Sequence, residues 1–295
     1  MNGVIDRLIL ACTAGAASQD CESAHNFSRY PCRVPKLAAN LSLLFTEQPF
    51  LERFAAAARA GFRAVEYQFP YAFGSAAEVA AAARAAGVEV VLHNLPGGDF
   101  AKGDRGIACL PERAGEFREG VERAIEYATA ASCRRLNCLA GVVPPQAPRA
   151  RHFDTLCENL RFAAAKLKSA GIGLMLEACN TRTIPGFFVS TSRQAIEALD
   201  AAGAGNAYLQ YDLFHMQIME GDLAKTAERL LGRIGHVQLA DVPDRHEPGT
   251  GEINYPWLLA HFDRIGYSGW IGCEYNPKAG TAEGLAWAKP YLAKR

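Results

Sequence analysis

The sequence predicts a single (β/α)8 barrel preceded by a short N-terminal extension. From Lys36 onward, short apolar runs alternate with longer helix-periodic segments, and eight such units follow one another in ~260 residues. A barrel of this kind typically has ~250 residues. The rival fold, a doubly wound open sheet, usually carries a glycine-rich turn after its first strand. Here ANLSLLF follows that strand, with no such glycine, so the barrel is favoured.

The eight expected strands are short runs rich in Val, Leu, Ile or Ala, each ending at a polar or Gly/Pro loop. Runs that are apolar throughout are typical of parallel strands buried on both faces. The expected strands span residues 36–41, 63–68, 88–93, 134–139, 172–177, 207–212, 235–240 and 270–275.

The segments between the strands have helical periodicity. In 49–60, 112–131 and 155–170, apolar residues recur at spacings of three and four and so share one face. Several helices are followed by a glycine just before the next strand, where a left-handed backbone conformation ends the helix. These glycines are Gly61, Gly87, Gly171 and Gly266.

The composition is that of an ordinary globular protein with a large core. The chain has 295 residues, 49% hydrophobic and 21% charged, with a formal net charge of zero. A balanced charge does not favour a nucleic-acid surface or a polybasic membrane patch. No apolar run reaches the ~18 residues of a membrane-spanning helix. We therefore expect neither a nucleic-acid partner nor a membrane association.

Nine cysteines are present, without any CxxC pair. Cys138, Cys179 and Cys273 lie in or beside apolar strand runs, as buried free thiols do. Free thiols persist in reducing compartments, so we expect a cytoplasmic protein.

Residues 1–35 differ from the rest of the chain. Their apolar run, LILA before Cys12, is shorter than the ~7–15 residues of a secretory signal, and Asp6 precedes it. We expect a poorly ordered extension at 1–35 and one barrel domain at 36–295, with no second domain.

Oxygen-bearing side chains end four successive strands. Glu177, Asp212 and Glu274 end strands five, six and eight, and Gln238 lies near the end of strand seven. These strand ends are neighbours on the rim where barrel enzymes build their sites. Converging acids repel one another unless a cation holds them, and oxygen ligands suit Mg²⁺ or Mn²⁺. The alternative is that each acid pairs with Arg or Lys, or caps the following helix.

Other polar residues lie on the same rim. His93 ends strand three and His215 follows Asp212, and each is a candidate substrate ligand or a structural histidine. Arg245, in the loop after strand seven, is suited to bind a substrate carboxylate, or is a solvated loop charge. Glu247 in the same loop and Glu66 on strand two are further substrate-binding candidates; the case for Glu66 is the weakest, and a structural role is equally expected for it.

The core from Lys36 onward resembles the hydroxypyruvate isomerase family of the xylose-isomerase-like barrel superfamily. The resemblance covers nearly the whole core and excludes the first ~35 residues. The stretches that carry it are AANLSLLFTEQPFLERF, AVEYQFPYAF, LHNLPGGDFAKGDRGIACLP, LNCLAGVVP, YDLFHMQIMEGDL, GHVQLAD, PGTGEIN and GWIGCEYNPK.

This resemblance implies a metal-dependent aldose–ketose isomerase that interconverts hydroxypyruvate and 2-hydroxy-3-oxopropanoate (tartronate semialdehyde) through an enediolate. The family's metal positions fall on Glu177, Asp212, Gln238 and Glu274, and its proton donor/acceptor pair falls on Glu177 and Glu274. Related sugar epimerases have a histidine where this chain has Gln238, which argues against a ketose 3-epimerase. Superfamily relatives are often dimers or tetramers, so a homo-oligomer is compatible with the resemblance.

Two other functions remain open. PWL and GYSGWIGCEY look at least as much like 2-oxo-tetronate isomerases, whose substrate is one CHOH unit longer, whereas HNLPGGDFAKGDRGIACLP favours the hydroxypyruvate side. The superfamily also includes metal-dependent phosphodiesterases and DNA-repair endonucleases. Those use several His and Asp ligands and a basic groove, which seven histidines and a balanced charge do not favour.

Overall fold

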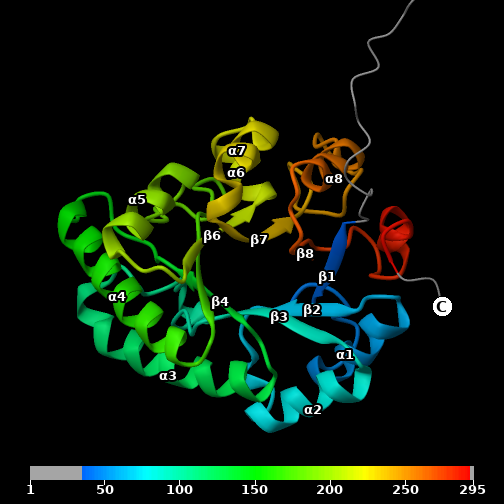
Figure 1. Cartoon of the computed structure of the whole chain (residues 1–295), viewed down its shortest axis with the longest axis horizontal. Coiled ribbons are helices and arrows are strands. Elements are labelled where there is room, and N and C mark those ends of the chain that lie inside the picture. Colours follow the sequence, from blue (N-terminus) through cyan, green and yellow to red (C-terminus); the bar gives the residue numbers. More distant parts are fainter. Residues whose placement is uncertain (1–34, 293–295) are drawn as a thin grey trace, which may run out of the picture. The chain divides into compact units, whose positions relative to one another are not determined.

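The protein was analysed as a computed structural model that describes residues 35–292. The prediction of an extension at 1–35 therefore falls almost entirely outside the described residues. Eight parallel strands form a closed barrel in sequence order, with β1 paired to both β2 and β8 (Figure 1). The predicted fold class is thus confirmed. The strands are β1 (Lys36–Asn40), β2 (Ala64–Tyr67), β3 (Glu89–Asn94), β4 (Arg135–Leu139), β5 (Gly173–Glu177), β6 (Ala207–Asp212), β7 (Ile234–Leu239) and β8 (Trp270–Cys273).

Helices cover the outside of the strands (Figure 1). Helix α4 begins at Arg149, well before the predicted residue 155. The prediction missed this start because the first residues of the helix, RARHFD, are mostly polar and show no apolar period. The last unit closes with a 3-10 helix, Glu283–Ala288, instead of an α-helix. The helices are α1 (Phe50–Arg59), α2 (Ala76–Ala86), α3 (Ala114–Ala130), α4 (Arg149–Ser169), α5 (Ser192–Ala202), α6 (Leu213–Met219), α7 (Leu223–Leu230) and α8 (Tyr255–Arg264).

The glycines predicted at helix ends have the expected backbone conformation. Gly61, Gly87, Gly171 and Gly266 have φ of 102°, 66°, 70° and 87°. L-residues adopt this left-handed region only at a cost, so glycine is favoured there.

The inside of the barrel is unusually polar toward the carboxyl ends of the strands. Barrel interiors are normally filled by Val, Ile and Leu. Here Ala38, Ala64 and Met175 form a small apolar cluster, and six polar residues are almost fully buried beyond it. Polar side chains in the lumen can donate hydrogen bonds to polar groups at the carboxyl ends of the strands. The six are Asn40, Glu66, Asn137, Gln210, His236 and Gln238.

Glu66 requires space inside this lumen. A Cβ atom at Gly272 on β8 would overlap the Glu66 carboxylate, so the glycine leaves room for Glu66 in its present position. The six cysteines among the described residues are all buried and free, as predicted. No helix within residues 35–292 is long and apolar enough to cross a membrane.

Candidate active site

Three buried carboxylates meet at the carboxyl end of the barrel. Glu177 is the last residue of β5, Asp212 is the last of β6, and Glu274 directly follows β8. One oxygen of each lies within 4.8 Å of an oxygen of the others, and all three side chains are buried. The structure therefore brings together the three acids that strand order placed on one rim.

Glu177 is held by two amides and faces a histidine. Its Oε2 accepts hydrogen bonds from Asn137 Nδ2 at 2.7 Å and from Gln210 Nε2 at 3.0 Å. Its Oε1 lies 3.7 Å from His215 Nε2. Burial, with repulsion from Glu274 and Asp212, raises the pKa of Glu177 well above its ordinary value.

His215 presents a neutral N–H to the acids. Its Nδ1 accepts a hydrogen bond from the backbone N–H of Asn180 at 3.0 Å, so the ring proton belongs on Nε2. Burial lowers the pKa of His215 to about 4, which keeps the ring uncharged near neutral pH. The Nε2 atom lies 3.6 Å from Asp212 Oδ2, so one N–H faces two carboxylates.

Asp212 divides its oxygens between structure and site. Oδ1 caps α6 by accepting the backbone N–H groups of Phe214 and His215 at 2.8 and 3.3 Å. Oδ2 lies 3.5 Å from Arg245 Nη2. Capping by one oxygen leaves the other turned toward the cluster.

Glu274 is paired with Arg245. Its Oε2 accepts a hydrogen bond from Arg245 Nη2 at 2.6 Å, while Oε1 accepts from Asn40 Nδ2 and Gln68 Nε2, both at 3.1 Å. Burial raises the pKa of Glu274 to about 7 although the guanidinium opposes the rise. A carboxyl group with this pKa can both give and take a proton near neutrality.

A tightly bonded loop presents Arg245. The carboxylate of Asp241 accepts four backbone N–H groups of the β7–α8 loop, including those of Gly249 and Gly251 at 2.9 Å. Arg245 itself has φ of 61°, a strained conformation for a residue with a side chain. The bonds to Asp241 offset this strain, and the guanidinium is thereby aimed at the acids.

Gln238 lies in the layer beneath the acids. Its Nε2 donates to Glu66 Oε1 at 2.7 Å, and its Oε1 accepts from Gln210 Nε2 at 2.6 Å. Glu66 also accepts from Asn40 at 2.9 Å and has His236 Nε2 2.6 Å from its other oxygen. Glu66 is thus inside the lumen, connected to the acids only through amides.

A cavity of about 230 Å³ opens above the acids. Glu177, Glu274, His215 and Arg245 line it, together with apolar walls from Phe69, Phe100, Leu139, Ile184 and Phe187. The charged groups therefore line a small pocket whose walls are partly polar and partly apolar.

Three predicted substrate-binding residues do not line this cavity: His93, Glu247 and Glu66, the last of which lies in the lumen. The His93 ring stacks on Tyr67, its Nδ1 lies 3.2 Å from the Asn94 carbonyl, and burial lowers its pKa to about 4. The Glu247 carboxylate instead accepts the backbone N–H of Lys278 at 2.9 Å. Their substrate-binding roles remain predictions without a contact to the cavity.

The donor set fits a hard divalent cation. Glu177, Asp212 and Glu274 offer three converging oxygens, and their mutual repulsion would be relieved by a positive ion. In the structure Arg245 supplies part of that charge. The sequence offered two alternatives to a metal site, pairing of the acids with arginine and capping of a helix. Both interactions are present here, together with a donor set that could hold a cation.

Four polar residues of the site were not predicted: Asn40, Gln68, Asn137 and Gln210. Each donates a side-chain N–H to one of the two glutamates at the rim. A signal was present for Gln210, since it lies two residues before Asp212 and so on the same face of the strand. Asn137 is likewise a polar residue within a buried strand.

Comparison with known proteins agrees with this geometry. Residues 54–291 match the family model described as xylose isomerase-like TIM barrel. A 2-oxo-tetronate isomerase of Cupriavidus necator is 47% identical over 261 residues, covering 88% of this chain and all of the relative. A hydroxypyruvate isomerase of Escherichia coli is 47% identical over 256 residues, covering 87% and 99%.

Among solved structures, one from Brucella melitensis, described as an AP endonuclease of family 2, superposes with a TM-score of 0.85. It is 45% identical and covers 88% of this chain and 100% of its own. With the family match and the two curated relatives, the conclusion is that this chain is an isomerase belonging to the xylose isomerase-like TIM barrel family.

Proposed function

We propose that this isomerase interconverts hydroxypyruvate and 2-hydroxy-3-oxopropanoate with a divalent cation, Mg²⁺ or Mn²⁺, held by Glu177, Asp212 and Glu274. Gln238 is the proposed fourth ligand. One observation carries the proposal: two buried carboxyl groups with raised pKa values line a single small cavity.

The reaction moves a proton between neighbouring carbons. One glutamate removes a proton from C3 of hydroxypyruvate, and a carboxyl group returns a proton at C2, while the hydroxyl and carbonyl oxygens exchange roles. Glu177 and Glu274 are the candidates because both carboxyl groups line the cavity where the substrate would lie. The bound cation would supply positive charge that stabilises developing negative charge on the substrate oxygens.

Arg245 and His215 complete the proposed site. Arg245 donates from Nε to the Glu274 backbone carbonyl and from Nη2 to the carboxylates of Glu274 and Asp212. Its Nη1 makes no hydrogen bond to a described residue. That nitrogen is the proposed anchor for the substrate carboxylate. The Nε2–H of His215 is the proposed donor to a substrate oxygen.

The second candidate is a 2-oxo-tetronate isomerase, because the C. necator relative of that name is as similar as the E. coli hydroxypyruvate isomerase. The stretch HNLPGGDFAKGDRGIACLP, which resembles the hydroxypyruvate side, favours the three-carbon substrate. An endonuclease function has less support. Of the described residues that line the cavity, Arg105 and Arg245 are balanced by Glu177 and Glu274, whereas a nucleic-acid groove has a basic excess.

The test measures kcat/KM for both substrates side by side, with Mg²⁺ or Mn²⁺ supplied, for the wild type and for Glu177→Gln. We expect hydroxypyruvate to be preferred and Glu177→Gln to lower turnover by ~10²–10⁴ without unfolding the protein. Glu122→Gln, at a surface residue paired with Lys166, is the matched control and should be unaffected. A preference for the tetronate would transfer the proposal to the second candidate, and near wild-type turnover by Glu177→Gln would refute the acid/base assignment.

A further inference from the structure

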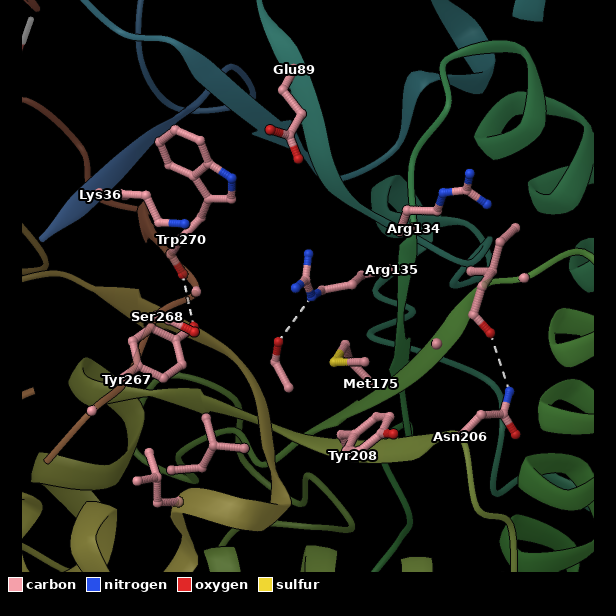
Figure 2. A pocket seen from close by; sticks show the side chains of 18 of the residues that line it. Lys36, Glu89, Arg134, Arg135, Met175, Asn206, Tyr208, Tyr267, Ser268 and Trp270 are labelled. Atoms are coloured by element: carbon pink, nitrogen blue, oxygen red, sulfur yellow. Dashed lines mark hydrogen bonds between the residues drawn. The ribbon is translucent and has the colours of Figure 1, made fainter.

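A second, larger cavity lies at the opposite end of the barrel from the acids. It has a volume of about 810 Å³ and is lined by residues at the amino-terminal ends of the strands, including Lys36 of β1, Arg135 of β4 and Trp270 of β8 (Figure 2). Gly173 and Gly235 line it where β5 and β7 begin, so no side chains fill these positions. The catalytic proposal uses none of these residues.

The charge of this cavity is one-sided. Among the described residues that line it, Lys36, Arg134, Arg135 and Lys168 are cationic and Glu89 alone is acidic. None of the four cations forms an ion pair within residues 35–292. The chain as a whole carries no net charge, so this excess is local. Uncompensated charge of one sign in a concave surface attracts counter-ions.

Arg135 is the central group of the cavity. Its side chain is half-buried and projects into the middle of the opening (Figure 2). Nε donates to the Gly235 carbonyl at 2.9 Å, which fixes the direction of the guanidinium. Its two terminal nitrogens make no hydrogen bond to any described residue and remain available for a ligand. A partly desolvated guanidinium with free donors favours a bidentate anionic partner.

The other cations surround Arg135 from different elements. Lys36 Nζ lies 5.1 Å from the centre of the Trp270 ring, a cation–π contact that holds the ammonium beside the opening. Arg134 directly precedes β4 and Lys168 lies in the last turn of α4, and the Arg134 guanidinium lies near Gly171 between α4 and β5. A ligand with two or more anionic groups could contact the positive groups on both sides of the opening at once. A ligand with a single carboxylate could contact only one side.

We propose that this amino-terminal mouth is a binding site for a small phosphorylated molecule that carries at least two anionic groups. Phosphate oxygens pair bidentately with guanidinium groups, and the walls formed by Trp270, Tyr208 and Tyr267 can contact an organic part. This ligand differs in class from the monoanionic substrate proposed for the other end.

Inorganic pyrophosphate is the probe, titrated into the EDTA-treated full-length protein by calorimetry at ~50 mM salt, where surface charges are only partly screened. We expect a dissociation constant below ~1 mM and an increase in Tm on binding. Arg134→Ala/Lys168→Ala, at two exposed positions, should weaken binding about tenfold, and Arg135→Gln should weaken it at least as much.

Lys166→Ala is the matched control. It removes a cation from the same helix as Lys168, but its ammonium pairs with Glu122 outside the cavity. Its affinity for pyrophosphate should stay within about twofold of the wild type. Absence of binding by the wild type would overturn the proposal. So would equal weakening by Lys166→Ala, which indicates general screening, or weakening by Arg245→Met alone, which places the anion at the other mouth.

Discussion

Ionised Glu274 should destabilise the metal-free protein, and Glu274→Gln should remove that effect. The pKa of Glu274 is about 7 in the folded protein against an ordinary value of 4.5. One pKa unit corresponds to ~1.4 kcal/mol, so the difference amounts to roughly 3 kcal/mol of unfolding free energy.

The sign follows from proton binding. Folded Glu274 holds its proton more tightly than the unfolded chain does, so the folded state is favoured at low pH. This contribution is fully present below pH 4.5 and is lost as the pH rises to about 7. The metal-free wild type should therefore become less stable over this window, relative to a variant that cannot ionise at position 274.

The assay is thermal unfolding of EDTA-treated wild type and Glu274→Gln between pH 4.5 and 8, followed by circular dichroism. A difference of ~3 kcal/mol corresponds to a change of roughly 6–12 °C in the Tm difference between the two proteins for a domain of this size. Comparing the two proteins cancels the titration of groups outside the acid cluster, so the Tm difference reports on Glu274 and the neighbouring acids coupled to it. If the Tm difference does not change between these pH values, the buried, repelled carboxyl group inferred here is refuted.

Two further perturbations test the layers of the site. Removing the divalent cation with EDTA should abolish isomerase activity. Restoring Mn²⁺ at 100 times its Kd should then raise the free energy of unfolding by ~2.7 kcal/mol. Unchanged activity in a protein shown by elemental analysis to hold no metal would contradict the metal proposal. Glu66→Gln should lower kcat about tenfold with little change in KM, because it disturbs groups that position the acids without contacting substrate; a change confined to KM would instead support direct substrate binding by Glu66.

The strand-end acids could be predicted because, in a barrel of parallel strands, residues at the carboxyl ends of different strands lie at the same end of the barrel. Once eight parallel strands are recognised, the carboxyl ends of β5, β6 and β8 must meet on one rim. Glu177, Asp212 and Glu274 are therefore brought together by topology alone, and no knowledge of side-chain rotamers is needed.

Loop residues could not be placed in the same way. Arg245 and Glu247 are two positions apart, yet Arg245 points at the acids and Glu247 bonds to the backbone of Lys278. The four hydrogen bonds to Asp241 and the left-handed conformation of Arg245 decide this difference. Neither has a periodic signal in the sequence, so both residues were equal candidates.

The buried layer beneath the acids holds the Gln238 amide in one orientation. An amide offers an oxygen on one side and a donor on the other, and rotation exchanges them. Glu66 accepts hydrogen bonds from Asn40 and Gln238, so the Gln238 NH₂ faces Glu66 and its oxygen faces Gln210. Gln210 also donates to Glu177, so a chain of amides connects Glu66 to that acid. The Glu66 carboxyl group in the lumen thus fixes the orientation of the amide above it, and this accounts for a polar residue where a barrel would otherwise place an aliphatic one.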